Sequence, residues 1–164
     1  MWTNWHAARN IERLESTQID WTDYSGQLDT PRGIISVAPL RATSTSTGAL
    51  TRQEANSLLF RNWGFNAGFN VLGIELRLTV DRLARIQDKV IQLYMGQAQG
   101  RNLANIATEN QQVYGGGGDL WGLTQALDWH DENFGVIIDL QPHQQYPSSN
   151  PAVIRSVELR LNVS

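Results

Sequence analysis

The densest group of potentially reactive side chains in the sequence is Asp128-Trp129-His130-Asp131-Glu132, which places three carboxylates and one imidazole within five residues. Carboxylate oxygens together with a histidine nitrogen can ligate a divalent cation. The segment lacks the glycine and the alternating oxygen ligands of a calcium-binding loop. We therefore expect a solvated connection that leads into the next strand, with no metal or cofactor site.

The other residues that often do chemistry are isolated. His6, His130 and His143 lie far apart in the sequence, none adjoins a motif that would orient a nucleophile or a base, and we expect each on a surface loop. Residues 115–118 are four glycines without the Lys-Ser/Thr of a phosphate-binding loop, which predicts a flexible or bulged loop. The sequence also lacks cysteine and the common hydrolase motifs. We expect no catalytic residues and no enzymatic activity, although glycosidase carboxylate pairs leave no motif in one sequence.

Tryptophan is over-represented, with six residues. Large aromatic side chains outside strands favour protein interfaces, because each buries ~150 to 250 Å² there. We expect Trp2 and Trp5 to contact a partner, whereas Trp63, Trp121 and Trp129 fit an interface and a plug at the ends of the core equally well. Exposed aromatic rings can also stack on sugar rings, so a carbohydrate-binding module stays an alternative. The candidate interface residues are Trp2, Trp5, Ile11, Trp21, Trp63, Trp121 and Trp129.

Length and charge narrow the classes of partner. The chain has 164 residues, which fits one domain. Its 13 basic and 16 acidic residues give a net charge of −3, so no strong positive field attracts nucleic acid or anionic lipid. No apolar run reaches the roughly 18 residues of a membrane helix, and the N-terminus lacks the pattern of a signal peptide. We expect neither a nucleic-acid nor a membrane partner.

The pattern of the sequence changes near residue 56. Residues 1–55 are polar and poor in strand pattern, and we interpret them as an irregular N-terminal arm with a first strand at residues 34–40. Within the arm, apolar residues at every third position of residues 4–15 predict a short helix. Residues 56–164 consist of alternating apolar runs separated by turn residues, which predicts the body of the fold.

Strict alternation marks the strands of the body. In residues 71–80, Leu72, Ile74, Leu76, Leu78 and Val80 fall on one face, which predicts a half-buried strand. The same period of two appears in three further segments, and glycine-, proline- or asparagine-rich turns, including residues 114–119, separate the strands. We predict an all-β protein whose body is an antiparallel β-sandwich of jelly-roll type. The three further strand segments are residues 89–95, 134–140 and 157–163.

Short motifs follow one another over residues 56–164. They are Trp63-Gly-Phe65, Leu72-Gly-Ile-Glu-Leu-Arg77, Arg85-Ile-Gln-Asp88, Val90-Ile-Gln-Leu93, Asn102-Leu-Ala104, Tyr114-Gly-Gly, Asp119-Leu-Trp-Gly122, Phe134-Gly-Val136 and Val157-Glu-Leu-Arg-Leu161. In order and spacing this succession resembles a jelly-roll β-sandwich that recurs in virion proteins of tailed bacteriophages. The arm departs from that pattern, because it is longer and has an insertion around residues 20–32.

The resemblance implies a non-enzymatic structural protein of the virion, assembled in the host cytoplasm. As a capsid decoration (cement) protein it would bind other virion proteins, above all the major capsid protein, through its N-terminal arm and loops, and we expect a homo-oligomer. A tail, neck or fibre component and a receptor- or carbohydrate-binding module are the alternatives, since the sequence does not separate shell from tail. Deletion of residues 1–33 is expected to leave a folded body that no longer joins the particle.

Overall fold

Every regular element that the computed structural model describes is a β-strand. The described residues are 1–14, 21–22, 35–37, 42–44, 50–52, 57–80, 86–105, 109–123, 127–142 and 152–164. Their strands are β1 (His6–Ala7), β2 (Asn10–Arg13), β3 (Trp21–Thr22), β4 (Ile35–Val37), β5 (Ala42–Ser44), β6 (Leu50–Arg52), β7 (Leu58–Arg61), β8 (Val71–Val80), β9 (Ile86–Tyr94), β10 (Ala98–Gln99), β11 (Gln111–Gly116), β12 (Gly135–Pro142) and β13 (Ala152–Val163). Over these residues, no helix is long and apolar enough to cross a membrane.

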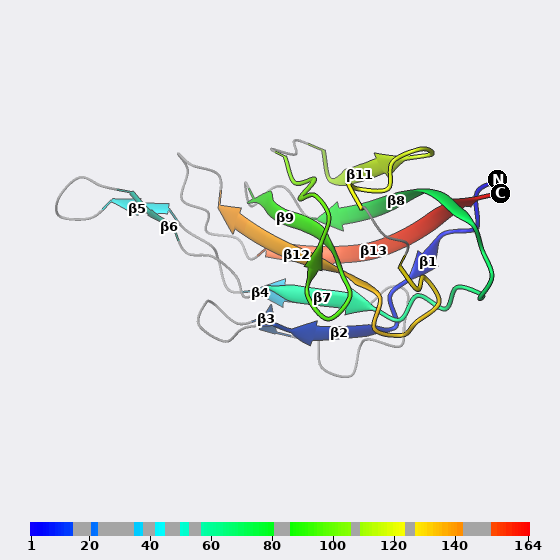
Figure 1. Ribbon diagram of the computed structural model, residues 1–164. Coiled ribbons are helices and arrows are strands. Elements are labelled where there is room, and N and C mark those ends of the chain that lie inside the picture. The colour runs from blue at the N-terminus through cyan, green and yellow to red at the C-terminus, as the bar shows by residue number, and fades with distance from the viewer. Residues whose placement is uncertain are drawn as a thin grey trace.

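The strands form two antiparallel sheets (Figure 1). The first sheet has the order β11-β8-β13-β4-β3, with β1 also paired to β13, and the second has the order β10-β9-β12-β7-β2. Strands β5 and β6 pair only with each other, as a separate two-stranded sheet that Figure 1 shows apart from the other strands.

The core lies between the two sheets. The first sheet contributes Leu76 and Leu159, and the second contributes Ile91 and Val136, all fully buried within one hydrophobic cluster. Because neighbouring residues of a strand point to opposite faces, the predicted alternation follows directly from this arrangement. The expected β-sandwich is therefore confirmed, as are strands in the four segments where the alternation was strict.

Two details of the strand prediction are wrong. Leu72, expected to face the core, is 43% exposed, because the pairing of β8 with β13 shifts its register between Asn162 and Val163 and so turns Leu72 outward. Residues 114–119, expected as a turn, begin inside a strand, since Gln111–Gly116 pairs with β8. Because glycine is typical of turns, the sequence pattern predicted a turn where β11 is still paired.

The short helix predicted at residues 4–15 is not formed in the part that the structure describes. Residues 6–7 and 10–13 are strands, and β2 pairs with β7 over Asn10 to Arg13. The edge of β7 offers four residues of backbone pairing and a core face for Ile11, which outweighs the weak local preference for a helix. Glu15 lies outside the described residues. The division of the chain at residue 56 remains a proposal based on composition.

The N-terminal segment lies along β13. Strands β1 and β4 both pair with β13, β1 near Leu159 and β4 near Val153, so that they share the same side of this long strand. The terminal amine donates hydrogen bonds to Asn162 Oδ1 (2.9 Å) and to the Val163 carbonyl (2.8 Å). Figure 1 accordingly shows the two chain ends side by side. Strands β1, β3 and β4 of the arm are thus joined to the first sheet and β2 to the second, whereas β5 and β6 belong to neither.

Candidate binding site

Trp2 and Trp5, expected at an interface, are half-buried against the outer face of the first sheet. The Arg160 guanidinium lies 4.3 Å from the Trp2 ring centre and 4.5 Å from that of Trp5, and Arg77 lies 4.3 Å from Trp5. Each arginine also pairs across β8 and β13 with a glutamate: Arg160 with Glu75 at 2.6 Å and Arg77 with Glu158 at 2.7 Å. These contacts are cation–π and ionic. They hold the N-terminal segment on its own sheet.

Trp63 and Trp121 belong to the core, with exposed fractions of 2% and 0%. The Trp121 indole Nε1 donates to the carbonyl of Ile74 on β8 (3.1 Å), while its backbone N–H donates to Asp119 Oδ1 (2.7 Å). Asp119 is also paired with Arg101. The Asp119-Leu-Trp-Gly122 motif is therefore a turn that closes one end of the sandwich. Neither indole is available to a partner's surface.

The remaining candidate interface residues differ in what the structure describes. Ile11 on β2 is half-buried and packs against the core. The backbone of Trp21 pairs with Val37 in β3 and β4, and its side chain lies outside what is described. Trp129 is half-buried, and its ring meets that of the buried Phe134 edge-on, with centres 5.1 Å apart. Trp129 thus packs on the core and also lines a pocket formed by surface loops.

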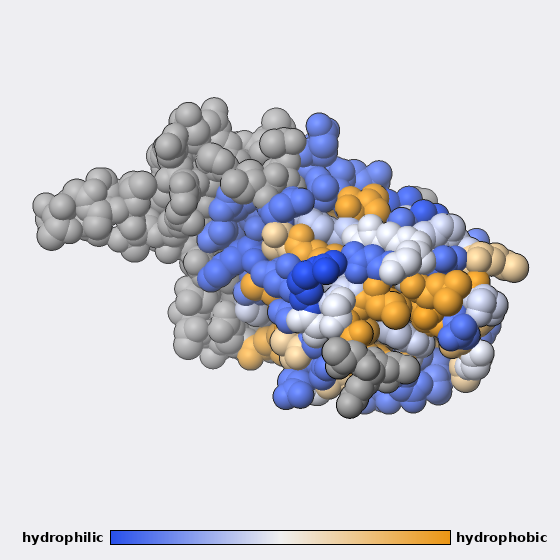
Figure 2. Space-filling model, turned by 45° about the horizontal axis from the view of Figure 1, so that its top comes forward, coloured by the Kyte–Doolittle hydropathy of each residue, from blue (hydrophilic) through white to orange (hydrophobic). Residues whose placement is uncertain are grey.

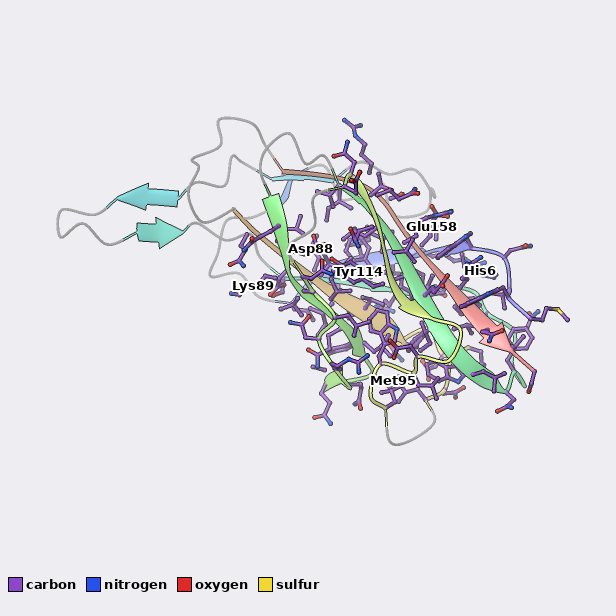
Figure 3. The ribbon with its side chains drawn as sticks, turned by 90° about the horizontal axis from the view of Figure 1, so that it is seen from above. His6, Asp88, Lys89, Met95, Tyr114 and Glu158 are labelled. Carbon is purple, nitrogen blue, oxygen red and sulfur yellow. The ribbon has the colours of Figure 1, made fainter. Side chains whose placement is uncertain are left out.

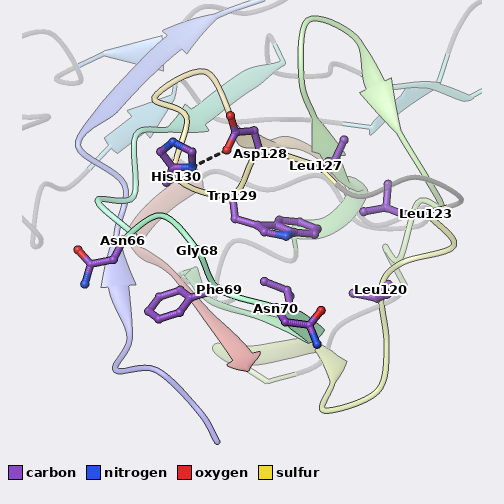
Figure 4. Close-up of a pocket in the computed structure, with 11 residues that line it drawn as sticks. Asn66, Gly68, Phe69, Asn70, Leu120, Leu123, Leu127, Asp128, Trp129 and His130 are labelled. Atoms are coloured by element: carbon purple, nitrogen blue, oxygen red, sulfur yellow. Dashed lines mark ion pairs between the residues drawn. The ribbon is translucent and has the colours of Figure 1, made fainter. Parts of the chain in front are cut away.

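That pocket, of about 340 Å³, lies where two connections between strands meet (Figure 4). The connection from β7 to β8 contributes residues 66–70, with Val71 at the start of β8, and the connection from β11 to β12 contributes residues 120–123 and 127–130. Phe69 and Trp129 supply aromatic surface, and the polar groups include Asn70 and Asp128. Figure 2 shows hydrophobic surface gathered towards the end of the molecule that carries both termini, beside mostly hydrophilic residues. The sequence pattern pointed to Trp129 but not to residues 66–70 or to the leucines of the β11–β12 connection, which converge with Trp129 only in the folded chain.

The cluster Asp128 to Glu132 forms part of this rim. Asp128 and His130 form an exposed ion pair, and the Asp131 backbone N–H donates to the Asp128 carbonyl (3.0 Å) in a tight turn. Asp131 Oδ1 in turn accepts from the backbone N–H of Asn133 (2.7 Å). Among the described residues, no three histidine, aspartate or glutamate side chains gather as potential metal ligands. The carboxylates mainly shape the turn that carries Trp129.

His6 is not the loop residue that the sequence suggested. It lies in β1, half-buried, with Nδ1 2.9 Å from the Trp63 carbonyl and its ring 4.4 Å from that of Phe65. This packing ties the N-terminal segment to the loop after β7. His143 lies outside the described residues.

A buried polar pair links the two sheets. The hydroxyl of Tyr114 on β11 donates to Asp88 Oδ2 on β9, and both residues are only 4% exposed (Figure 3). Because a hydrogen bond to a carboxylate in the core is among the stronger ones, Tyr114→Phe should lower the free energy of unfolding by about 2 kcal/mol. Urea unfolding followed by tryptophan fluorescence measures this.

The control for that substitution is Tyr94→Phe, at the half-buried end of β9, which should change stability by less than about 0.5 kcal/mol. Equal unfolding midpoints for the two variants would show that the Tyr114 hydroxyl contributes nothing to the contact between the sheets.

No model of a protein family matches the sequence, and no curated protein is significantly similar to it. The site must therefore be interpreted from its own geometry.

Proposed function

We propose that the protein is a non-enzymatic structural component of tailed-bacteriophage particles, acting as a capsid decoration protein on the shell. A tail, neck or fibre component is the alternative within the same class. The observation that carries the proposal is the order in which the strands pair, together with the positions of the motifs on those strands.

The pairing supports a jelly roll. Eight strands, β4 and β7 to β13, pair in reverse order: the first with the eighth, the second with the seventh, the third with the sixth and the fourth with the fifth. One antiparallel ribbon of four such pairs, wrapped on itself, produces two four-stranded sheets with Greek-key connections. Jelly rolls of this kind occur in viral capsid proteins and in lectins. Strands β2 and β3 then extend this unit at its edge strands β7 and β4, and β1 pairs with β13 beyond the end of β4.

The motifs that resemble phage proteins lie where this ribbon needs particular residues. In Phe134-Gly-Val136, a Cβ on Gly135 would lie 2.6 Å from the Phe60 carbonyl, so glycine lets β12 approach β7. In Asn102-Leu-Ala104, Asn102 Oδ1 accepts a hydrogen bond from the backbone N–H of Ile91 on β9 (2.9 Å). This contact holds the segment after β10 against β9. These motifs therefore support a shared architecture, and they say little about a catalytic site.

The charged groups of the described residues support a binding role over catalysis. Arg61 pairs with Glu12, and the other ionic contacts likewise lie on outer faces or in loops between neighbouring strands. A hydrolase would need an acid and a base that a closed site holds against a substrate. The Asp128–His130 pair on the pocket rim has side chains that are 56% and 47% exposed, so water reaches both of them.

The β5–β6 hairpin has the features of an element that attaches the protein to a partner. Two strands of three residues each, paired only with each other, are marginally stable in isolation. Their outer edges can add to a sheet of a neighbouring protein, with backbone hydrogen bonds supplying the affinity. We place the shell contact, with the major capsid protein as the partner, at this hairpin and not at residues 1–14, which are used within the fold. Several copies bound side by side as a homo-oligomer would add avidity.

Replacement of residues 42–52 by a Gly-Ser linker tests this attachment. The variant should keep the unfolding midpoint of the wild type, because the hairpin lies outside both large sheets. Its binding to particles that lack the protein should fall at least ~10-fold, as expected for loss of the central contact of an interface. Co-sedimentation of labelled protein with purified particles measures the binding.

The matched control for attachment is Gly118→Ala, which changes an open surface position. It should bind particles as the wild type does. Wild-type protein that fails to sediment with particles would contradict the proposed function, whereas equal binding by wild type and the hairpin variant would contradict only the role of the hairpin.

A further inference from the structure

The pocket at the loop end combines an apolar floor with an aromatic wall. Its floor is apolar, from Leu120, Leu123 and Leu127, and its wall includes the indole of Trp129. Small-ligand sites are typically concave, mostly apolar and about 300 to 1,000 Å³ in volume, with a few polar groups that fix orientation. At about 340 Å³ this pocket lies at the small end of that range.

The aromatic wall is held in place. The edge-on contact with Phe134, which is fully buried, fixes the Trp129 ring from behind with an angle of 88° between the ring planes. The turn that carries Trp129 is itself closed by the hydrogen bond from Asp131 to Asp128. A ring that is already oriented costs little conformational entropy when a ligand stacks on it.

Among the described residues that line the pocket, the polar ones supply both donors and acceptors but include no lysine or arginine. These polar residues are Asn66, Asn70, Asp128 and His130. Asn70 is oriented by Ser164. The side-chain Nδ2 of Asn70 donates to Ser164 Oγ (2.8 Å), and the backbone carbonyl of Asn70 accepts from the backbone N–H of Ser164 (3.1 Å). Amide and carboxylate groups satisfy hydroxyl groups, which donate and accept at once. The lining residue that can carry a positive charge, His130, is already paired with Asp128, so a phosphate would lack a free cationic partner among these lining residues.

We propose that this pocket binds a neutral pyranose sugar, free or at the end of a glycan. The apolar face of the ring stacks on Trp129, and its hydroxyl groups bond to Asn66, Asn70 and Asp128. The site is separate from the β5–β6 hairpin, so a particle that displays the protein can contact shell and glycan at the same time. The inference extends the proposed function, and it does not depend on it, since the purified protein alone carries the site.

Saturation-transfer NMR with methyl glycosides of glucose, galactose, mannose and N-acetylglucosamine tests the site on the full chain. At least one glycoside should receive saturation, with a dissociation constant on the order of 1 mM, as a shallow one-ring site allows. Trp129→Ala should weaken that binding at least ~10-fold. The double variant Asn66→Ala/Asp128→Asn, which changes exposed side chains only, should weaken it by a similar factor while its unfolding midpoint stays that of the wild type.

Trp5→Ala is the matched control, because it removes a half-buried tryptophan from the outer face of the first sheet and should leave binding unchanged. Two outcomes would overturn the proposal. One is the absence of saturation transfer to all four glycosides in folded wild-type protein. The other is unchanged affinity in the double variant. A glycan array then separates the two sources of the ligand: signal for terminal residues of long glycans indicates a surface glycan, and signal for the monosaccharides alone indicates a free sugar.

Discussion

Gly115→Ala is expected to destabilise the fold by at least about 3 kcal/mol, which is a large effect for one methyl group. Gly115 has a φ of 90°, a conformation that residues with a side chain rarely adopt. A Cβ there would lie 2.0 Å from the Ile74 carbonyl and 2.7 Å from Trp121 Nε1. The new atom would therefore force β11 away from β8 and break the indole hydrogen bond that closes the end of the sandwich. Urea unfolding followed by circular dichroism measures the loss.

Another glycine of the same run, Gly118, provides the control for that prediction. A Cβ on Gly118 meets nothing within 4 Å, so Gly118→Ala should change stability by less than about 0.5 kcal/mol. If Gly115→Ala and Gly118→Ala unfold at the same urea concentration, the pairing of β11 with β8 is not as described.

Deletion of residues 2–7 is expected to have the second large effect, because it should lower the free energy of unfolding by about 3 kcal/mol or more. Thr3 exchanges two hydrogen bonds with Leu161, from N–H to carbonyl at 2.8 Å and from the Leu161 N–H to Oγ1 at 3.0 Å. Each contributes roughly 1 kcal/mol, and each cation–π contact with Arg160 or Arg77 adds about 0.5 to 1 kcal/mol. The deletion also exposes one edge of β13, which should promote self-association. Urea unfolding and analytical ultracentrifugation measure the two effects.

A peptide with the sequence of residues 1–8, added in trans, should restore the unfolding midpoint of the truncated protein and return it to its original association state. The same peptide with alanine at Trp2 and Trp5 should restore less. A truncated protein as stable as the wild type would show that the N-terminal segment is a detachable arm, as the composition of the sequence first suggested.

The sequence predicts best those strands that have one apolar, buried face and one polar, outward face. Strand β8 follows from alternation alone because its inward residues, such as Leu76 and Leu78, meet the other sheet, whereas its outward residues, such as Arg77, form the outer face on which Trp5 packs. Where one end of the strand passes a register shift, the rule fails, as Leu72 shows. Alternation describes a face, and it does not locate the place where the partner strand slips.

The prediction failed where long-range pairing decides the structure. The first fourteen residues have no strong strand pattern, and their strands exist because β7 and β13 offer unpaired edges far away in the sequence. The tryptophans show the same limit. Trp121 and Trp129 look alike in the sequence, both near acidic residues in glycine- or aspartate-rich loops, yet one is fully buried and the other lines a pocket.

The candidate site could be predicted only in part for a related reason. The aspartates and Trp129 stand together in the sequence, whereas Leu120 reaches the same pocket from the far end of the same connection and Phe69 from the connection between β7 and β8. These loops meet because β7–β8 and β11–β12 connections leave the sandwich at the same end, which follows from the order of the strands and not from any local pattern.

An electron cryo-microscopy reconstruction of phage particles assembled with the protein tests whether the sandwich binds virion proteins. We expect density for the two-sheet body on the outside of the shell, with the β5–β6 hairpin touching a neighbouring protein and the pocket of Trp129 facing solvent. Purified particles that contain none of the protein, in the shell or in the tail, would contradict it.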